Sequence, residues 1–254
     1  MDKFYTKSKE EIETMAECGQ KLAMVKKALF EKVVEGVSSW EIEETAVKLI
    51  EEEGVEASFK KVPGYLWATC VNINAGLVHG IPKKEIIFKK GDVVSVDLGL
   101  FFKGFHTDCS FSKGINVNTS TEKFLTVGRD ALKNAIDKVK VGNRIYDISE
   151  AIEKTVVAGG YKPIRALVGH GIGRELHEDP QIPCFLPSAK KESMEIIEGA
   201  TFAIEVMYTQ GSPDLVQEED GWTISTQDGK ISALFEETVA VVFGRPKVLT
   251  DFFG

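Results

Sequence analysis

The hydrophobic pattern of the chain begins as helical. Apolar residues recur at three- and four-residue spacings from residue 8 to about residue 34, and again from residue 38 to residue 54. Each segment opens with a serine followed three residues later by a glutamate, which is typical of a capped helix N-terminus. The two pairs are Ser8 with Glu11 and Ser38 with Glu41. The pattern therefore predicts two helices at the start of the chain.

The pattern then changes to short runs of β-branched and aromatic residues separated by glycine and proline, which is typical of strands. Helical spacing returns in the middle of the chain before strand-like runs resume. We expect strands at residues 70–73, 93–98, 105–111, 200–206 and 231–243, and helices at residues 121–138 and 146–157. The second and third strands are expected to pair in antiparallel fashion, and residues 209–220 to form a surface loop.

Three features occur twice in the same order: a glycine-bounded helix, a His-Gly-Ile loop and a strand that ends in an acid. They lie at residues 36–54, 79–81 and 91–97, and again at 142–160, 170–172 and 199–205. Chance similarity of common elements is the alternative, but the shared order favours duplication. We expect an α+β fold in a single domain with halves at about residues 1–118 and 119–254. A pseudo-twofold axis would bring the acid-bearing strands to a shared cleft.

Composition places the chain among globular proteins. Its 254 residues are 43% hydrophobic and 28% charged, which is ordinary for a soluble domain. No apolar run reaches the roughly 20 residues of a membrane span, and the N-terminus does not resemble a secretory signal. The net charge of −8 argues against general nucleic-acid binding. Four cysteines without a CxxC pair argue against a disulfide framework or a zinc knuckle and favour the cytoplasm.

The four histidines all lie in glycine-containing stretches, at His79, His106, His170 and His177. Glycine lets the backbone or a ligand approach closely, and neutral imidazole is a common metal ligand and proton carrier. Histidines scattered over the surface or core would not produce this grouping. The most glycine-rich stretch surrounds His170, which we take as the strongest candidate metal ligand.

Four acids extend this candidate site. Asp97, Glu205 and Glu236 lie within apolar, strand-like runs, and Asp108 lies close by. A carboxylate buried alone is costly and needs a cation or strong donors. For any one of these acids an edge-strand or salt-bridge position is the simpler interpretation, but four acids with a matching histidine favour a metal site.

The charge of the four carboxylates, about −4, would be balanced by two divalent cations, and mostly oxygen donors favour Mn, Fe, Co or Zn over copper. Two such ions can hold a bridging hydroxide and polarise a carbonyl. A carboxylate that touches the hydroxide could act as general base. His79 and His177 could bind the substrate carbonyl or amine and stabilise a tetrahedral intermediate.

Several landmarks along the chain match one known family. They are His79-Gly80-Ile81-Pro82, Asp97 and Asp108 eleven residues apart, Gly169-His170-Gly171-Ile172-Gly173, His177-Glu178-x-Pro180, Gly221-Trp222-Thr223 and Ser232-Ala233-x-Phe235-Glu236. As a set, these motifs resemble the bacterial-type (type I) methionine aminopeptidases, which are metallopeptidases of the pita-bread fold. The resemblance covers essentially the whole chain.

The resemblance implies removal of the initiator methionine from nascent polypeptides whose second residue is small, by a metal-bridged hydroxide that attacks the first peptide bond. It implies two metal ions on Asp97, Asp108, His170, Glu205 and Glu236. It also implies catalytic roles for His79, His177 and Glu205, and a substrate pocket formed by His79, His177, Tyr65, Cys70 and Trp222. His106 matches the family sequence without being a ligand, so we assign it a structural role. We expect a cytoplasmic monomer that acts near the ribosome, without binding nucleic acid or membrane.

Some residues depart from the family pattern, and they bear on side-chain preference more than on chemistry. They are Phe59, Ala75, Gly76, Val78, Leu176, Leu234 and Glu237. Two alternatives therefore remain open. One is a pita-bread aminopeptidase with another first-residue preference, including proline-specific enzymes and prolidases, although those usually carry a large extra N-terminal domain. The other is a non-catalytic member of the fold that only binds peptides.

Overall fold

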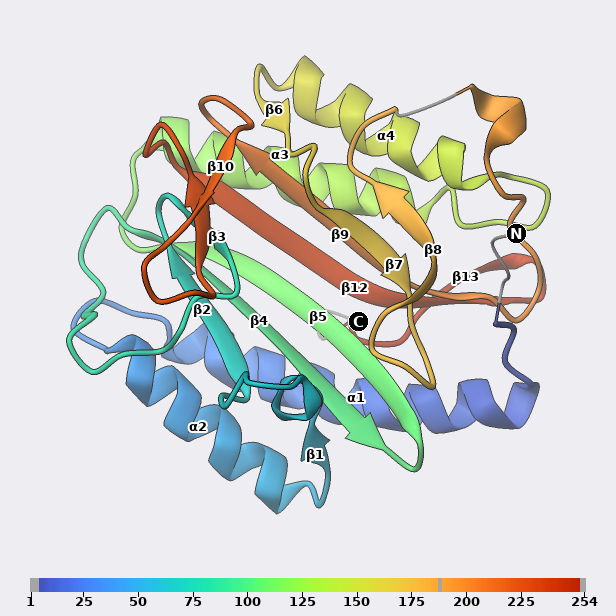
Figure 1. The fold of residues 1–254 in the computed structure, drawn as a ribbon, viewed down its shortest axis with the longest axis horizontal. Helices are drawn as coiled ribbons and strands as arrows, with labels where there is room; N and C mark the ends of the chain where they lie inside the picture. Colours follow the sequence, from blue (N-terminus) through green and yellow to red (C-terminus); the bar gives the residue numbers. More distant parts are fainter. Residues whose placement is uncertain (1–4, 187–188, 252–254) are drawn as a thin grey trace.

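The structure is a computed structural model that describes residues 5–186 and 189–251. It shows an α+β fold built on one large antiparallel sheet (Figure 1). Four long strands form its centre: β4 (Val93–Phe102), β5 (Phe105–Gly114), β12 (Ser232–Val242) and β9 (Thr201–Thr209), in that spatial order. The flanking strands are β1 (Glu56–Ala57), β2 (Thr69–Ile73), β6 (Lys162–Pro163), β7 (Val168–Gly171), β8 (Glu178–Pro183) and β13 (Arg245–Val248). The expected α+β class and the antiparallel pairing of β4 with β5 are confirmed.

A second, three-stranded sheet consists of β10 (Leu215–Gln217), β11 (Ile224–Thr226) and β3 (Gly76–Val78). The prediction that residues 209–220 form only a surface loop was wrong, because β10 lies within them and pairs with β11. A three-residue strand is too short to show an alternating pattern. Its pairing partner supplies the regularity that the local sequence lacks.

The helices form two pairs on either side of the long strands in Figure 1. They are α1 (Lys9–Lys32), α2 (Ser39–Glu52), α3 (Thr119–Ile136) and α4 (Ile145–Ala158), with short 3-10 turns η1 (Phe59–Lys61) and η2 (Lys190–Glu192). Helix α1 packs on β4 and β5 with α2 beside it, and α3 packs on β9 and β12 with α4 beside it. The capping boxes at Ser8 and Ser38 are both present. We propose that these two sets of elements are the halves expected from the repeat.

Strand alternation assigns the acids to one face of the sheet. Val96 and Leu98 of β4 pack in the core formed with α1, so Asp97 between them points to the opposite face. Glu205 on β9 likewise lies between Ile204 and Val206, and Glu236 on β12 follows Phe235; all three neighbours pack in the core under α3. The helix-covered face therefore carries the apolar core, and the other face carries the carboxylates.

Glu237 follows Glu236 on β12 and therefore points toward the helices. There it forms an ion pair with Lys26 of α1, with 2.5 Å between Nζ and Oε1, and the two side chains are 3% and 14% exposed. Lys26 also donates to the backbone oxygen of Glu236 at 3.4 Å, and Thr250 donates to Glu237. This pair ties α1 and the C-terminal segment to the strand that carries Glu236.

Replacing Lys26 with Met should destabilise the fold by about 3–5 kcal/mol, because Glu237 would remain buried without its cation. The double variant Lys26→Met/Glu237→Gln should regain much of that loss, since no charge is left unpaired. Urea unfolding measures both, with Lys48→Met as control because its ion pair with Glu52 is exposed. A single variant as stable as the wild type would contradict the assignment.

Candidate metal centre and active site

One cavity of about 170 Å³ is lined by every residue to which the sequence analysis assigned a metal, catalytic or substrate role. These ten residues are Tyr65, Cys70, His79, Asp97, Asp108, His170, His177, Glu205, Trp222 and Glu236. The cavity walls also include Phe59, Val62, Val78 and Leu176. Residues separated by more than half the chain thus converge at one place, on the sheet face that the helices leave uncovered.

The register of the sheet explains how the four acids meet. Asp97 on β4 lies opposite Ser110 on β5, Ser110 lies opposite Glu236 on β12, and Glu236 lies opposite Glu205 on β9. Residues that pair across strands share a face, so this row crosses four strands with its side chains on one side. Asp108 sits two residues from Ser110 along β5 and shares the same face.

His170 joins the acids from β7, where it pairs with Ala203 of β9. Its Nδ1–H donates to the backbone oxygen of Gly171 at 2.8 Å, which leaves the Nε2 lone pair free as a ligand. Nε2 lies 3.5 Å from Oε1 of Glu205. Burial lowers the pKa of His170 to about 3, so the ring is neutral at neutral pH. Within the described residues, ligand atoms of Asp108, His170 and Glu236 all lie within 4.8 Å of one another.

Burial raises the pKa of all four carboxyl groups, to about 7 for Asp97 and well above the usual range for Asp108, Glu205 and Glu236. The charges of neighbouring carboxylates raise the last three further. One oxygen of Asp97, Oδ1, is buried without a hydrogen-bond partner. When these groups are ionised, cations must compensate their charges; otherwise they hold protons. Four carboxylates and one neutral imidazole are a donor set that fits divalent metal ions.

His79 reaches the cavity from a strained backbone position. Its φ of 57° lies in the left-handed region, which is uncommon for residues other than glycine. The following residue, Gly80, accepts a hydrogen bond from the Val71 N–H at 2.8 Å, and a Cβ there would collide with the Val71 oxygen. The glycine thus allows the close approach to β2 that holds His79 in place, as the glycine-flanked histidines suggested.

The second cavity histidine, His177, lies in the loop between β7 and β8. Its ring centroid is 4.4 Å from that of His170. Burial lowers the pKa of both His79 and His177. Two neutral imidazoles that face the same cavity as the carboxylates can donate or accept a proton at a bound substrate.

The other end of the cavity is apolar and aromatic. The Tyr65 ring lies 5.1 Å from Trp222 and 6.4 Å from Phe59, centroid to centroid, in edge-on contacts. The Tyr65 hydroxyl donates to the Thr69 oxygen at 2.9 Å and lies 3.2 Å from the Cys70 sulfur. An ionic end joined to an apolar end suits a ligand with a polar reacting group and a hydrophobic side chain.

The residues that depart from the family pattern separate into two sets. Phe59, Val78 and Leu176 line the cavity. Ala75, Gly76, Leu234 and Glu237 are not among its lining residues in the described part of the chain. For Glu237 the reason is its position on the helix-facing side of β12.

Val62 and His106 differ in their position relative to the cavity. Val62 lines the cavity and was missed, because it follows a 3-10 turn where no periodicity marks it. His106 lies outside the cavity lining, with Nδ1 2.9 Å from the Ser58 hydroxyl, as expected of a residue with a structural role.

The comparisons with known proteins agree with this geometry. A sequence model of metallopeptidase family M24 matches residues 13–242. The chain belongs to metallopeptidase family M24. Within M24 it is 37% identical to the methionine aminopeptidase of Aquifex aeolicus, over 96% of this chain and 97% of that protein. Its fold matches the crystal structure of methionine aminopeptidase from Thermotoga maritima with a TM-score of 0.94 and 36% identity, over 98% of this chain and all of that one.

A prolidase from Pyrococcus furiosus also matches, with a TM-score of 0.76. Its identity is only 21%, and this M24 chain covers 65% of its length, so the likeness shows a shared fold alone. The comparisons support the methionine aminopeptidase interpretation over the prolidase and non-catalytic alternatives. None of the helices in residues 5–186 and 189–251 is long and apolar enough to cross a membrane.

Relative to an Asp97→Asn variant, the metal-free M24 protein should lose stability as the pH rises from about 6 to about 8. A raised carboxyl pKa stabilises the folded state at low pH, and this contribution disappears as the pH rises through that pKa, which for Asp97 lies at about 7. The comparison with the variant is needed because histidines also titrate in the unfolded chain near about pH 6.5, and their contribution is common to both proteins. Urea unfolding of both proteins with chelator present measures the effect. A stability difference that grows in favour of the wild type across this interval would contradict the assignment.

Proposed function

We propose that this M24 protein is a methionine aminopeptidase that removes the N-terminal methionine from polypeptides whose second residue is small. One observation carries the proposal. Four carboxylates and one imidazole meet at the polar end of a cavity whose other end is apolar. The similarity to named methionine aminopeptidases along nearly the whole chain supports the same substrate.

The residues that would hold metal are Asp97, Asp108, His170, Glu205 and Glu236. Divalent ions at such a site lower the pKa of a bound water and polarise a substrate carbonyl. Two ions balance the charge of four carboxylates, and the oxygen-rich donor set supports Mn, Fe, Co or Zn. The raised carboxyl pKa values and the unpartnered Asp97 oxygen support a cation requirement independently of the family.

Glu205 would act as general base. Its carboxyl group lines the cavity beside His170, and burial raises its pKa, which makes it a better proton acceptor once it is ionised. His79 and His177, neutral and facing the same cavity, would donate hydrogen bonds to the substrate carbonyl or bind its amine. A donor placed at the carbonyl oxygen stabilises the negative charge that develops there.

The aromatic end of the cavity would hold the methionine side chain. Tyr65, Cys70 and Trp222 surround it together with Phe59 and Leu176. A thioether makes favourable contacts with aromatic rings and adapts to an irregular pocket. These contacts support methionine over the rigid ring of proline.

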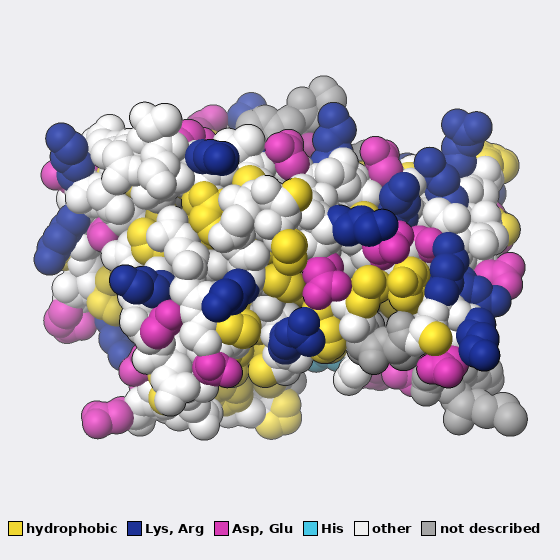
Figure 2. Space-filling view, turned by 90° about the horizontal axis from the view of Figure 1, so that it is seen from above, with side chains coloured by type: hydrophobic (Ala, Val, Ile, Leu, Met, Phe, Trp, Pro, Cys, Tyr) yellow, Lys and Arg dark blue, Asp and Glu magenta, His cyan; other side chains and the backbone are white. Residues whose placement is uncertain are grey.

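The same proposal includes the setting of the reaction. The enzyme would act as a monomer in the cytoplasm, on nascent polypeptides near the ribosome. All four cysteines are buried and free, which supports a reducing compartment. On the face seen in Figure 2, basic and acidic side chains are interspersed. This mixture supports the expectation that the protein does not bind nucleic acid.

A peptide beginning Met-Ala-Ser should release free methionine in the presence of Mn²⁺ or Co²⁺, and a chelator should abolish the release. His170→Ala should lower kcat/KM by about 100-fold or more, because losing a ligand weakens a metal site more than losing its outer partners does. Circular dichroism checks that the variant is folded. A folded variant with full activity would show that the site is wrongly assigned.

A panel of peptides that differ only at the first residue tests the pocket. Methionine should be released fastest, with proline and charged residues far slower. Trp222→Ala should lower kcat/KM for the methionine peptide by about 10-fold, the loss expected for one buried aromatic contact of about 1.5 kcal/mol. Faster release of proline would favour the proline-specific alternative, and no release of any residue would favour the non-catalytic one.

A further inference from the structure

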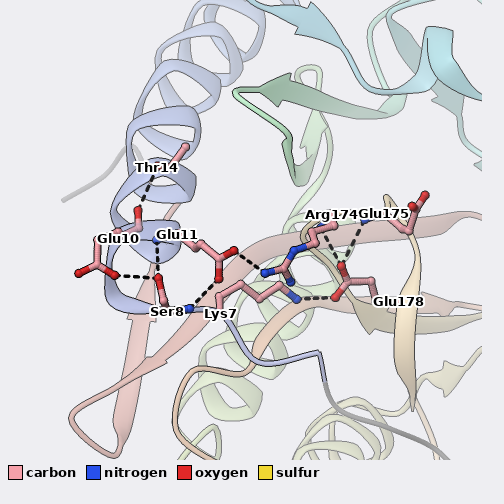
Figure 3. A network of polar contacts seen from close by, with 8 residues as sticks. All are labelled: Lys7, Ser8, Glu10, Glu11, Thr14, Arg174, Glu175 and Glu178. Carbon is pink, nitrogen blue, oxygen red and sulfur yellow. Dashed lines mark hydrogen bonds and ion pairs between the residues drawn. The ribbon is translucent and has the colours of Figure 1, made fainter.

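A buried ion pair outside the cavity links the N-terminal segment to the loop that carries His177. The Lys7 ammonium donates to one carboxylate oxygen of Glu178, and the two side chains are only 1% and 4% exposed. Figure 3 shows the Lys7 side chain extending from the N-terminal end of α1 across to Glu178. Breaking such a pair leaves a buried charge without its partner, which is strongly unfavourable.

The other carboxylate oxygen of Glu178 holds the His177 loop in its folded shape through hydrogen bonds. Oε1 accepts hydrogen bonds from the backbone N–H groups of Arg174 at 2.7 Å and Glu175 at 3.2 Å (Figure 3). His177 lies between these donors and Glu178 in the chain, so the carboxylate folds the segment around it. Arg174 in turn pairs with Glu11 in the first turn of α1. Glu178 is therefore the common acceptor that holds both ends of a five-residue loop.

Lys7 is also fixed relative to the metal-binding strands. Its backbone N–H donates to the oxygen of Gly199 at 2.8 Å, two residues before β9 begins. Strand β9 carries Glu205. The backbone hydrogen bond therefore fixes Lys7 relative to β9. The ion pair with Glu178 in turn fixes the His177 loop relative to Lys7. Gly173 leaves room for this path, because a Cβ at residue 173 would collide with Lys7 Cε and lie 3.1 Å from Glu178 Oε1.

We propose that Lys7 is a positioning residue for His177: through Glu178 it sets the distance between the His177 ring and the residues on β9. Lys7 does not line the cavity and acts only through the loop. The kinetic consequence rests on the proposed aminopeptidase function, whereas the effect on the His177 ring does not. Displacement of a catalytic group lowers turnover more than it weakens substrate binding.

Lys7→Met tests the proposal, because it keeps the apolar stem and removes the charge. With Mn²⁺ and the Met-Ala-Ser peptide, kcat should fall by about 10- to 100-fold with KM nearly unchanged, as expected when a reacting group is misplaced by a fraction of an ångström. The double variant Lys7→Met/Glu178→Gln should recover part of kcat, since Gln still accepts from the two backbone N–H groups. Lys9→Met is the matched control, because the nearby Lys9 pairs with Glu13 on the exposed surface and should leave kcat unchanged.

A second readout does not depend on activity. The chain has four histidines, so each ring Cε1–H signal in an NMR spectrum can be assigned by substitution. Lys7→Met should shift the His177 signal and leave that of His79 in place. If Lys7→Met does not fold, Gly173→Ala displaces the same lysine without removing its charge and should give the same shift.

Two results would overturn the proposal. One is a folded Lys7→Met protein with the kcat of Lys9→Met and an unshifted His177 signal. The other is a loss of activity that only matches the fraction of unfolded protein, which would reduce Lys7 to a role in stability. Failure of the wild-type protein to release methionine would instead count against the proposed function, and the NMR shift would still decide the role of Lys7.

Discussion

Electrostatic repulsion among four buried carboxylates is the constraint on which the rest of this structure depends. Asp97, Glu236 and Glu205 lie in one row across the sheet, and Asp108 lies beside them. A fold that brings these groups together out of water must compensate them, by protons or by cations. Burial raises the pKa of all four groups, and the neighbouring carboxylates raise those of Asp108, Glu205 and Glu236 further. The adjoining His170 is neutral, so it would supply a further metal ligand instead of a compensating charge.

The two faces of the sheet carry different kinds of residue. The helix-covered face holds the apolar cores that stabilise the fold. The opposite face holds the carboxylates that we propose as metal ligands, and strand alternation keeps the two sets apart. Adjacent residues of β12 show the separation most clearly. Glu236 faces the cavity, and Glu237 faces α1 and its partner Lys26.

Much of this could be predicted from the sequence, because the signals were local. The capped helices and the strands that carry Asp97, Glu205 and Glu236 follow from periodicity and from acids in apolar runs. The family motifs then singled out all ten residues that were assigned a role, and the structure brings them to one cavity.

The features that the sequence did not reveal depend on partners distant in the chain. The short strand β7 around His170 and the strand β10 are regular only because they pair with other segments. Val62 reaches the cavity from an irregular turn. Lys7 looked like an ordinary lysine before a helix cap, and only the fold shows that it is buried against Glu178, 171 residues further along.

The central claim is that four carboxylates and one imidazole hold a pair of divalent cations in this cavity. Anomalous X-ray diffraction from crystals grown with Mn²⁺ tests it most directly. The account predicts two anomalous peaks, about 3.5–4 Å apart, among Asp97, Asp108, His170, Glu205 and Glu236. Absence of any peak at these residues, with manganese bound elsewhere, would contradict it.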